Sequence, residues 1–390
     1  MQAQTRLSWG WLQRLADFIP VFIAILLAIA TSAVLLLALE ADPFLAFSEM
    51  LGGAFGTENA FAETLVKAVP IMFVGIGITI AFRGGVINIG GEGQMIAGAL
   101  MGTAVTLALG ESVGWLVIPA ALVAAFIGGG LYGAIAGFLK AYFDVNEILS
   151  TIMLNQVAVQ LMNYLLNGPM LDPESAGVNH IPKTARIAEI AELPRLVLGF
   201  GDNALFDRTR LHWGLIIAII LAVLSYILLW RTVVGFRIRA VGYNERASRY
   251  AGFRVKQQIV LSMFLSGGMA GVGGAVQVLG LQYRLQTDGS PAGFTGSAGF
   301  NGIVAALFGG LNPLGAVPAS VLFGGLLVGA QKMQRELGVP AAMITAINGI
   351  IVIFVVSSQI FIQRRMQRRA KLEIAAVEKE KYESPAQESG

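Results

Sequence analysis

The sequence predicts an all-α membrane protein, a polytopic transmembrane helix bundle of about ten spans. Mean hydropathy is +0.70, and hydrophobic residues make up 55% of the chain. Charged residues make up only 13% of its 390 residues, against about 25% in soluble domains. The 48 glycines favour the same class, because small residues allow helices to approach closely within lipid.

Apolar windows mark the spans, since about 20 residues are needed to cross ~30 Å of hydrocarbon. The first seven expected spans are 20–39, 64–82, 86–108, 115–139, 148–166, 213–230 and 258–280. The uncharged run 299–331 is too long for one crossing at ~1.5 Å per residue. Pro313 divides it into a short span at 297–311 and another at 314–331, because proline cannot continue the helical hydrogen bonds. A last span covers 340–362.

Charged loops indicate the orientation, because basic residues favour the cytoplasmic side of a membrane. The loop 231–257 carries seven basic residues against the single acid Glu245, and five more follow the last span. The loop 40–63 carries five acids and no Lys or Arg, which suits the outside. Ten spans with both termini in the cytoplasm satisfy all three assignments, and the large loop 168–212 is then external.

The chain divides into three regions by composition. We expect a cytoplasmic N-terminal interfacial segment at 1–19, a transmembrane domain at 20–362 and a solvated cytoplasmic tail at 363–390. The sequence pI is near 9.2, but the basic residues lie beside spans, where a membrane protein needs them. Membrane lipid is therefore the expected partner of this charge, and no nucleic acid partner is expected.

The residue content also disfavours an enzyme. The chain has no cysteine and only two histidines, His180 and His212, which excludes disulfides and thiolate sites and leaves little material for an imidazole metal site. It contains no phosphate-binding Gly-x4-Gly-Lys-Ser/Thr motif, nucleophile elbow or His-Glu-x-x-His helix. We expect no metal and no cofactor bound by this chain, so any ATP that drives it is hydrolysed by another subunit.

The most informative segment runs from Phe82 to Gln94 and places Asn88, Glu92 and Gln94 among glycines between two apolar runs. An acidic residue at the centre of a span costs about 2.5–3.5 kcal/mol, so this segment must face protein or a water-filled path. Glu92 is either a pathway or gating residue, paired with Arg83 or bonded to backbone, or a structural hydrogen-bond hub. Asn88 and Gln94 fit contacts between helices better than ligand contacts.

The loop from Thr232 to Gln257 is too long for a tight connection and too patterned for a linker. Asn244 can cap a short helix at 245–250, which Gly252 would end. Such a cytoplasmic helix between two spans could dock into a soluble partner and transmit its motion. The alternative is a basic loop that sets the topology and contacts anionic lipid.

Four segments together resemble the membrane permease of an ATP-binding-cassette (ABC) importer, in the branch for simple sugars, branched-chain amino acids and nucleosides. They are 82–94, 146–155, 235–252 and 299–315, in family order along the chain. The stretch from Asn88 to Gln94 is similar to the nucleoside-type permeases, whereas sugar counterparts carry an Asp-Leu-Ser-type sequence there. The resemblance implies a permease that moves a nucleoside or related purine or pyrimidine compound, with a simple sugar as the alternative cargo.

The resemblance also implies site residues and partners. The substrate pathway would include Asn88, Glu92, Gln94, Asn155 and Asn301. The ATPase-coupling loop, a degenerate form of the importer signature, would use Gly235, Arg239, Gly242, Asn244, Glu245, Ala247 and Gly252. The partners would be cytoplasmic ATP-binding subunits, a second permease subunit (a copy or a paralogue) and an extracytoplasmic substrate-binding protein, assembled at the inner (plasma) membrane.

An ion-coupled secondary transporter, with Glu92 as its proton or sodium site, is the competing class. It predicts uptake that needs an ion gradient and no ATPase. Two features oppose it. Glu92 is a lone acid within a span, where ion-coupled carriers often have several, and the loop 232–257 is strongly patterned.

Overall fold

The computed structural model describes residues 23, 26–38, 40–175, 182–197, 199, 205–340, 343, 346–347, 349–350, 353–354 and 357. The chain forms two compact units, one of residues 1–46 with 337–390 and the other of residues 47–336. The predicted terminal segments 1–19 and 363–390, and most of the predicted last span 340–362, lie outside the described residues. The second unit contains the helical bundle.

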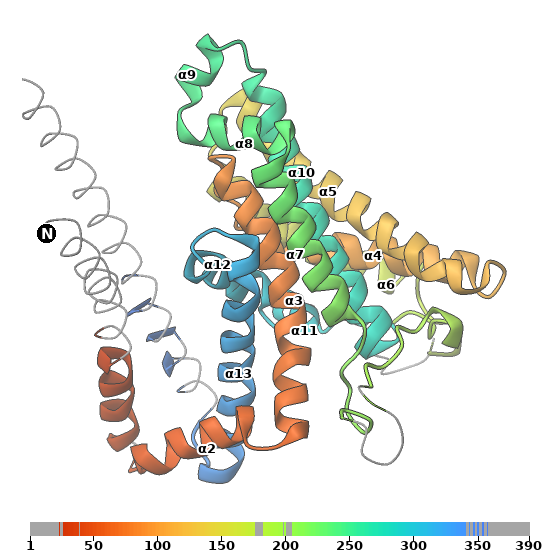
Figure 1. Ribbon diagram of the computed structural model, residues 1–390. Helices are drawn as coiled ribbons and strands as arrows, with labels where there is room; N and C mark the ends of the chain where they lie inside the picture. The colour runs from red at the N-terminus through yellow and green to blue at the C-terminus, as the bar shows by residue number, and fades with distance from the viewer. Residues whose placement is uncertain are drawn as a thin grey trace, which may run out of the picture. The chain divides into compact units, whose positions relative to one another are not determined.

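The described part of this unit is helical, with isolated β-bridges at Lys183–Gln286 and Arg195–His212 in place of strands. Its long helices coincide with the predicted spans (Figure 1). They are α3 (Glu58–Arg83), α4 (Gly91–Leu109), α5 (Val117–Phe143), α6 (Glu147–Leu166), α7 (Gly214–Arg231), α10 (Val255–Gln277) and α13 (Pro313–Leu337). The shorter helices are α2 (Pro43–Phe55), α8 (Val233–Tyr243), α9 (Glu245–Tyr250), α11 (Pro291–Thr295) and α12 (Ala298–Phe308).

Five helical stretches of the described residues are long and apolar enough to cross a membrane. They are Glu58–Arg83, Gly114–Phe143, Gly214–Arg231, Val255–Gln282 and Pro313–Leu337. α4 and α6 have 19 and 20 residues, enough length for a crossing, but they carry several polar side chains. The chain therefore has the helices of a multi-pass membrane protein.

The predicted division of the run 299–331 is confirmed, because α13 begins at Pro313. The preceding span, predicted at 297–311, is shorter than expected. α12 has only 11 residues and is about 16 Å long at ~1.5 Å per residue. By itself it covers about half of the ~30 Å hydrocarbon layer.

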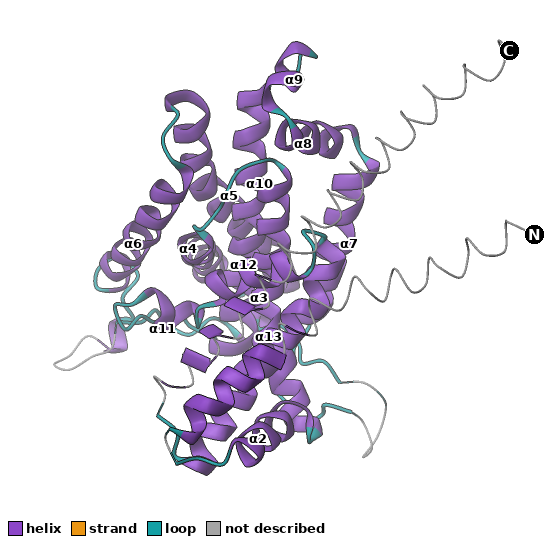
Figure 2. Cartoon of the chain, turned by 90° about the vertical axis from the view of Figure 1, so that its left-hand side faces the viewer, coloured by secondary structure: helices purple, strands orange, loops and turns teal. Residues whose placement is uncertain are grey.

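α10 packs against α5, α3 and α4 at the centre of the bundle (Figure 2). Glycines allow these contacts to be made backbone to backbone. A Cβ at Gly98 of α4 would collide with Gly271 of α10, and a Cβ at Gly129 of α5 would collide with the carbonyl oxygen of Gly267. Glycines thus lie where α4, α5 and α10 cross, as expected for close helix packing in lipid.

The predicted helix at 245–250 is confirmed as α9. Asn244 Oδ1 accepts the Ala247 N–H at 3.0 Å, and Gly252, with a φ of +80°, follows the helix where a left-handed residue ends it. The preceding helix α8 was not predicted. Thr232 caps it, since its hydroxyl accepts the Gly235 N–H at 3.1 Å. The loop between α7 and α10 is therefore a pair of helices.

The described part of the loop 168–212 folds onto the bundle. Ile187, Ala191 and Leu193 are buried in a core shared with α5, α7 and α10. Backbone hydrogen bonds join this loop to the segment after α10, with the Leu193 N–H donating to the Leu279 carbonyl oxygen at 2.9 Å. The loop is therefore part of the packed unit and covers one end of its helices.

Candidate functional site

The segment from Phe82 to Gln94 forms an irregular turn between two helices. α3 ends at Arg83, α4 begins at Gly91, and the residues between them are not helical. Irregular backbone at membrane depth needs hydrogen-bond partners from protein or water. The polar side chains that the sequence singled out supply many of them.

Asn88 and Gln94 form a reciprocal amide pair. Asn88 Nδ2 donates to Gln94 Oε1 at 2.9 Å, and Gln94 Nε2 donates to Asn88 Oδ1 at 3.0 Å. Asn88 Nδ2 also donates to Ser266 Oγ of α10 at 2.8 Å, and its Oδ1 accepts the Gly90 N–H at 2.9 Å. The Asn88 amide thus makes four hydrogen bonds inside the protein, with Gln94 of α4, Ser266 of α10 and Gly90 of the turn.

Asn155 of α6 holds the start of α4. Its Oδ1 accepts the Gly93 N–H at 2.8 Å, and its Nδ2 donates to the Ile89 carbonyl oxygen at 3.0 Å. Thr151, one turn earlier on α6, accepts the Ile89 N–H at 3.3 Å. One of the N–H groups that a helix start leaves unpaired is thereby satisfied by a neighbouring helix.

Glu92 likewise accepts free N–H groups at the start of α12. Its Oε1 accepts the Gly299 N–H at 2.9 Å and the Phe300 N–H at 3.3 Å. Both groups belong to the first turn of α12, where the free N–H groups and the helix dipole favour a carboxylate. The Thr295 side chain also hydrogen-bonds Glu92, and Glu92 is only 1% exposed. Of the two kinds of partner expected for Glu92, the structure therefore shows backbone N–H groups.

The alternative pairing of Glu92 with Arg83 is wrong. Arg83 Nε donates to the Leu311 carbonyl oxygen at 2.8 Å, and its Nη2 donates to the Gly310 carbonyl oxygen at 3.1 Å. The guanidinium also lies 5.4 Å from the centre of the Trp230 ring. Arg83 therefore binds two carbonyls of the turn that follows α12 and precedes α13.

Asn301, the fifth predicted pathway residue, lies outside this network. It is half-buried on α12, and its side chain makes no hydrogen bond with another described residue. The structure thus joins Asn88, Gln94, Asn155 and Glu92 in one region. Asn301 adjoins this region on α12, directly after the Phe300 N–H that Glu92 accepts.

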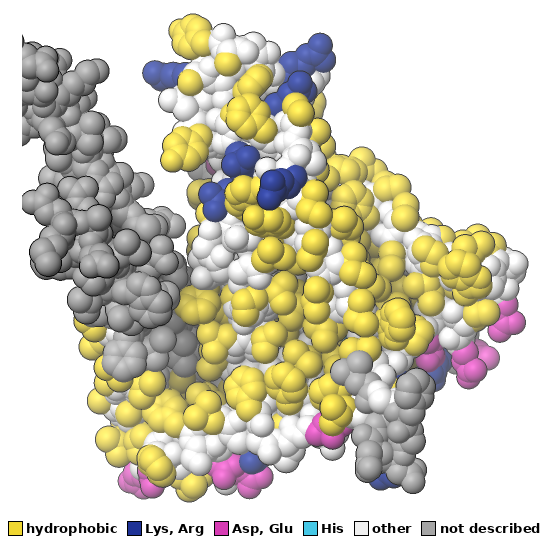
Figure 3. Space-filling view, in the orientation of Figure 1, with side chains coloured by type: hydrophobic (Ala, Val, Ile, Leu, Met, Phe, Trp, Pro, Cys, Tyr) yellow, Lys and Arg dark blue, Asp and Glu magenta, His cyan; other side chains and the backbone are white. Residues whose placement is uncertain are grey.

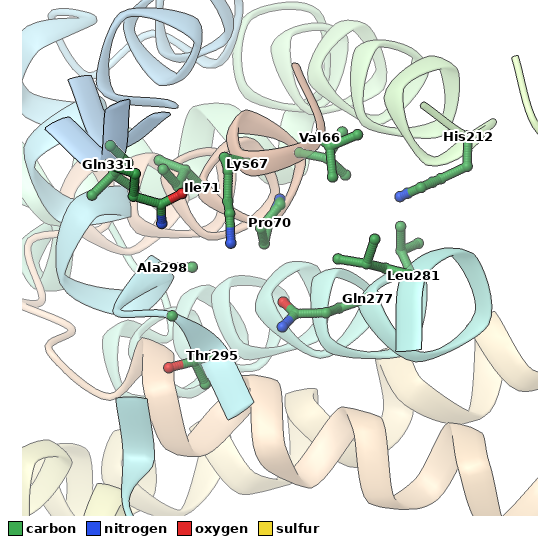
Figure 4. A pocket seen from close by; sticks show the side chains of 14 residues that line it. Val66, Lys67, Pro70, Ile71, His212, Gln277, Leu281, Thr295, Ala298 and Gln331 are labelled. Atoms are coloured by element: carbon green, nitrogen blue, oxygen red, sulfur yellow. The ribbon is translucent and has the colours of Figure 1, made fainter. Parts of the chain in front are cut away.

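A cavity of about 160 Å³ adjoins the network at Thr295, which both lines the cavity and bonds Glu92. Figure 4 shows side chains from α3, α10, the α11–α12 segment and α13 around it. Most of the lining is apolar. Its polar members are Lys67, His212, Gln277, Thr295 and Gln331. A mainly apolar hollow with a few converging polar groups is the usual form of a small-molecule site.

The sequence reasoning missed Lys67, although it lies within the predicted span 64–82. An ionisable residue inside an apolar run was the available signal, because such residues mark functional sites by default. His212 also lines the cavity, and burial lowers its pKa to about 4. Its Nδ1 accepts the Gly214 N–H at 3.1 Å, so the ring is neutral near pH 7. Among the lining residues, Lys67 carries the charge.

Two residues of the predicted coupling loop support the fold around it. Arg239 Nε donates to the Leu229 carbonyl oxygen at 2.9 Å, and its guanidinium lies 5.6 Å from the centre of the Trp230 ring. Gly235 is buried where α8 turns back on α7, and a Cβ there would collide with the Leu228 carbonyl oxygen. These contacts fix α8 against the end of α7.

The end of α8 also touches the irregular turn directly. A Cβ at Gly242 would collide with the Arg83 carbonyl oxygen and lie 2.7 Å from the Gly85 nitrogen. On the other side, a Cβ at Gly85 would lie 2.8 Å from the Gly242 Cα. Backbone atoms alone therefore make this contact, which joins the predicted coupling loop to segment 82–94.

The remaining residues of the predicted coupling loop lie on or beside α9 and are exposed. Glu245 pairs with Arg249 at 2.9 Å on the helix surface. Asn244 and Ala247 form the cap already described, and both are exposed. Apart from the buried Ser248, this short helix therefore presents its side chains outward, as a docking element would.

Long apolar helices that enclose irregular backbone are typical of membrane transport proteins. The chain belongs to the family described as the branched-chain amino acid transport system / permease component, which matches residues 60–356. This confirms the resemblance to the ABC importer branch. The chain is thus a multi-pass permease of the inner membrane.

Several named proteins are similar to this chain. The guanosine ABC transporter permease protein NupP of Bacillus subtilis (strain 168) is 37% identical over 89% of this chain and 95% of that protein. The glucose ABC transporter permease protein TsgB13 of Haloferax volcanii is 33% identical over 88% of each chain. The nucleoside ABC transporter permease protein NupB of Lactococcus lactis subsp. cremoris is 30% identical over 85% of this chain and 89% of that protein. No solved structure matches the chain significantly.

Proposed function

We propose that the chain is the permease subunit of an ABC importer for nucleosides or related purine and pyrimidine compounds. The observation that supports this substrate is the similarity to a guanosine permease and a nucleoside permease, at 37% and 30% identity over most of the chain. The similarity to a glucose permease, at 33% identity, supports a simple sugar as the second candidate substrate.

The proposed topology has ten spans and both termini in the cytoplasm. Figure 3 shows Lys and Arg side chains gathered at the end of the bundle that carries α8 and α9. A broad apolar belt follows, and Asp and Glu side chains gather at the opposite end. Because basic residues favour the cytoplasmic side, this distribution supports an internal α8–α9 pair.

The α8–α9 pair is the proposed docking element for a cytoplasmic ATP-binding subunit, which hydrolyses the ATP. Tyr243 and Tyr250 are 95% and 93% exposed, and Phe236 is also exposed. Exposed aromatic side chains among arginines are typical of protein interfaces. The contact of Gly242 with Gly85 then joins this surface to the turn that carries Asn88 and Glu92.

In this mechanism, ATP-driven closure of the partner subunits moves α8 and α9. This motion opens the substrate pathway to one side of the membrane and then to the other. Contiguous contacts lead from α8 to the irregular turn, from Glu92 to the start of α12, and from Thr295 to the cavity. A second permease, a copy or a paralogue, and an extracytoplasmic substrate-binding protein complete the proposed assembly. The binding protein would deliver cargo at the end opposite α8 and α9.

Charge reversal at Glu245 is expected to disrupt the docking without disturbing the bundle. The Glu245–Arg249 pair is exposed on both sides, and such pairs contribute at most about 1 kcal/mol to stability. Glu245→Arg should leave the amount of protein in the membrane unchanged and lower uptake at least tenfold. Glu111→Arg, the same change in the exposed α4–α5 loop, is the control. Wild-type uptake by Glu245→Arg would contradict docking through α9.

Purification from native membrane in mild detergent tests the proposed function. A stoichiometric ATP-binding subunit is expected to remain bound to the chain. A chain that purifies alone and takes up solute in vesicles under an ion gradient, without ATP, would instead support the ion-coupled alternative.

A further inference from the structure

The cavity contains a cation that nothing in the proposed mechanism uses. Lys67 lies on α3 and forms no ion pair or hydrogen bond with another described residue. Glu63, one turn earlier on the same helix, is bound instead by Arg210, whose Nη2 lies 2.7 Å from its carboxylate. An unpaired ammonium inside a span is costly and marks a functional site.

Gln277 provides an unused acceptor beside this unused donor. Its Nε2 donates to the Phe294 carbonyl oxygen, but its Oε1 is buried and accepts no hydrogen bond from the described residues. Both Gln277 and Lys67 line the cavity, and Figure 4 shows them extending into the same space from α10 and α3. The cavity therefore offers one strong donor and one free acceptor to a ligand.

The walls and the size of the cavity limit the kind of ligand. Its apolar lining includes Val69 and Ile71 of α3, Val276 of α10 and Leu327 of α13. Its volume is about 160 Å³, similar to the ~150 Å³ cavities that hold benzene and below the ~300 Å³ of sites for larger ligands. A ring-sized group with apolar faces and a polar edge fits, whereas a whole nucleoside does not.

We propose that this cavity recognises the base of a passing nucleoside, with Lys67 donating to a ring carbonyl oxygen and Gln277 Oε1 accepting from the adjacent ring N–H. The ribose would remain outside the cavity, in the pathway. Bases with this carbonyl and N–H edge, such as guanine, hypoxanthine and uracil, match the two groups. Adenine and cytosine carry an amino group in place of this carbonyl and a bare ring nitrogen in place of the ring N–H. Lys67 would then face a donor, and Gln277 Oε1 would face an acceptor. This inference rests on the proposed nucleoside import.

Uptake by the complete importer, reconstituted with its partner subunits, tests the proposal through the ratio of KM values for adenosine and guanosine. The wild type is expected to favour guanosine. Lys67→Met should raise the KM for guanosine about tenfold or more, since hydrogen bonds to charged groups contribute about 1.5–3 kcal/mol, and should change that for adenosine less. Lys332→Met is the matched control, because Lys332 pairs with Glu49 at 2.8 Å and does not line the cavity.

A labelling experiment gives a second readout that needs no change at Lys67. The chain has no cysteine, so Gln331→Cys places a single thiol in the cavity wall. Guanosine is expected to slow its reaction with a thiol reagent more than adenosine or ribose does. Glu111→Cys, on an exposed loop, should react at the same rate with or without nucleoside.

The outcomes separate the inference from the proposed function. If the wild-type importer takes up no nucleoside, the proposed function fails and base recognition fails with it. If it takes up nucleosides but Lys67→Met keeps the same KM ratio, or guanosine does not protect the thiol, base recognition in this cavity is wrong and nucleoside import stands.

Discussion

Glu92→Ala is expected to abolish uptake and to lower the unfolding temperature of the permease, whereas Glu92→Gln keeps both near wild type. Alanine removes the acceptor of the Gly299 and Phe300 N–H groups at the buried start of α12. Each buried donor left unpaired costs about 1–3 kcal/mol. Glutamine retains an oxygen at the same place and therefore retains the cap.

The glutamine variant also separates the two classes of transporter. A structural cap needs an oxygen acceptor, whereas a proton or sodium site needs an ionisable carboxylate. Thermal unfolding in detergent and uptake in vesicles should be measured on both variants. A Glu92→Gln protein that folds normally but transports nothing would contradict the structural role and favour the ion-coupled alternative.

Gly242→Val is expected to lower uptake more than tenfold and to separate ATP hydrolysis from transport. A Cβ at this position collides with the Arg83 carbonyl oxygen and approaches the Gly85 nitrogen to 2.7 Å. Overpacking of this kind costs about 1–3 kcal/mol and forces backbone shifts. The shift must fall between α8 and the irregular turn, where we propose that motion passes from the partner to the pathway.

Gly110→Ala, in the α4–α5 loop, is the matched control for this effect. Gly110 has a φ of +51°, and a Cβ there would meet no atom within 4 Å. The change therefore strains the local backbone, by about 1–2 kcal/mol, without pressing on the turn. ATPase activity and uptake should be compared in the two variants. Equal coupling in Gly242→Val and the wild type would show that the contact transmits nothing.

The sequence predicts the parts of this fold that depend on local patterns. Apolar length locates the long helices, Pro313 begins α13, and Asn244 caps α9 as expected. α8 escaped prediction because the sequence reasoning considered a cap at Asn244 and not at Thr232, which caps α8. The short helix α12 was predicted at 297–311, and only its end was placed too late, since the apolar run continues past Phe308, where the helix ends.

The candidate site depends on contacts that no local pattern contains. Glu92 bonds Gly299, 207 positions further along the chain, and Arg83 bonds Leu311, 228 positions away. Segment 82–94 could therefore be recognised as buried and polar, but its partners could not be chosen. The proposed role of Lys67 could not be predicted for the same reason, because it depends on the cavity that α3, α10, α12 and α13 enclose together.

ATP-dependent uptake by the purified importer, in vesicles without any ion gradient, is the decisive measurement of ATP-driven import. We expect that the chain, reconstituted with its ATP-binding and substrate-binding partners, moves nucleosides into the vesicle compartment only when ATP is supplied to the face that carries α8 and α9. Uptake that persists without ATP and disappears when proton and sodium gradients are removed would contradict this expectation.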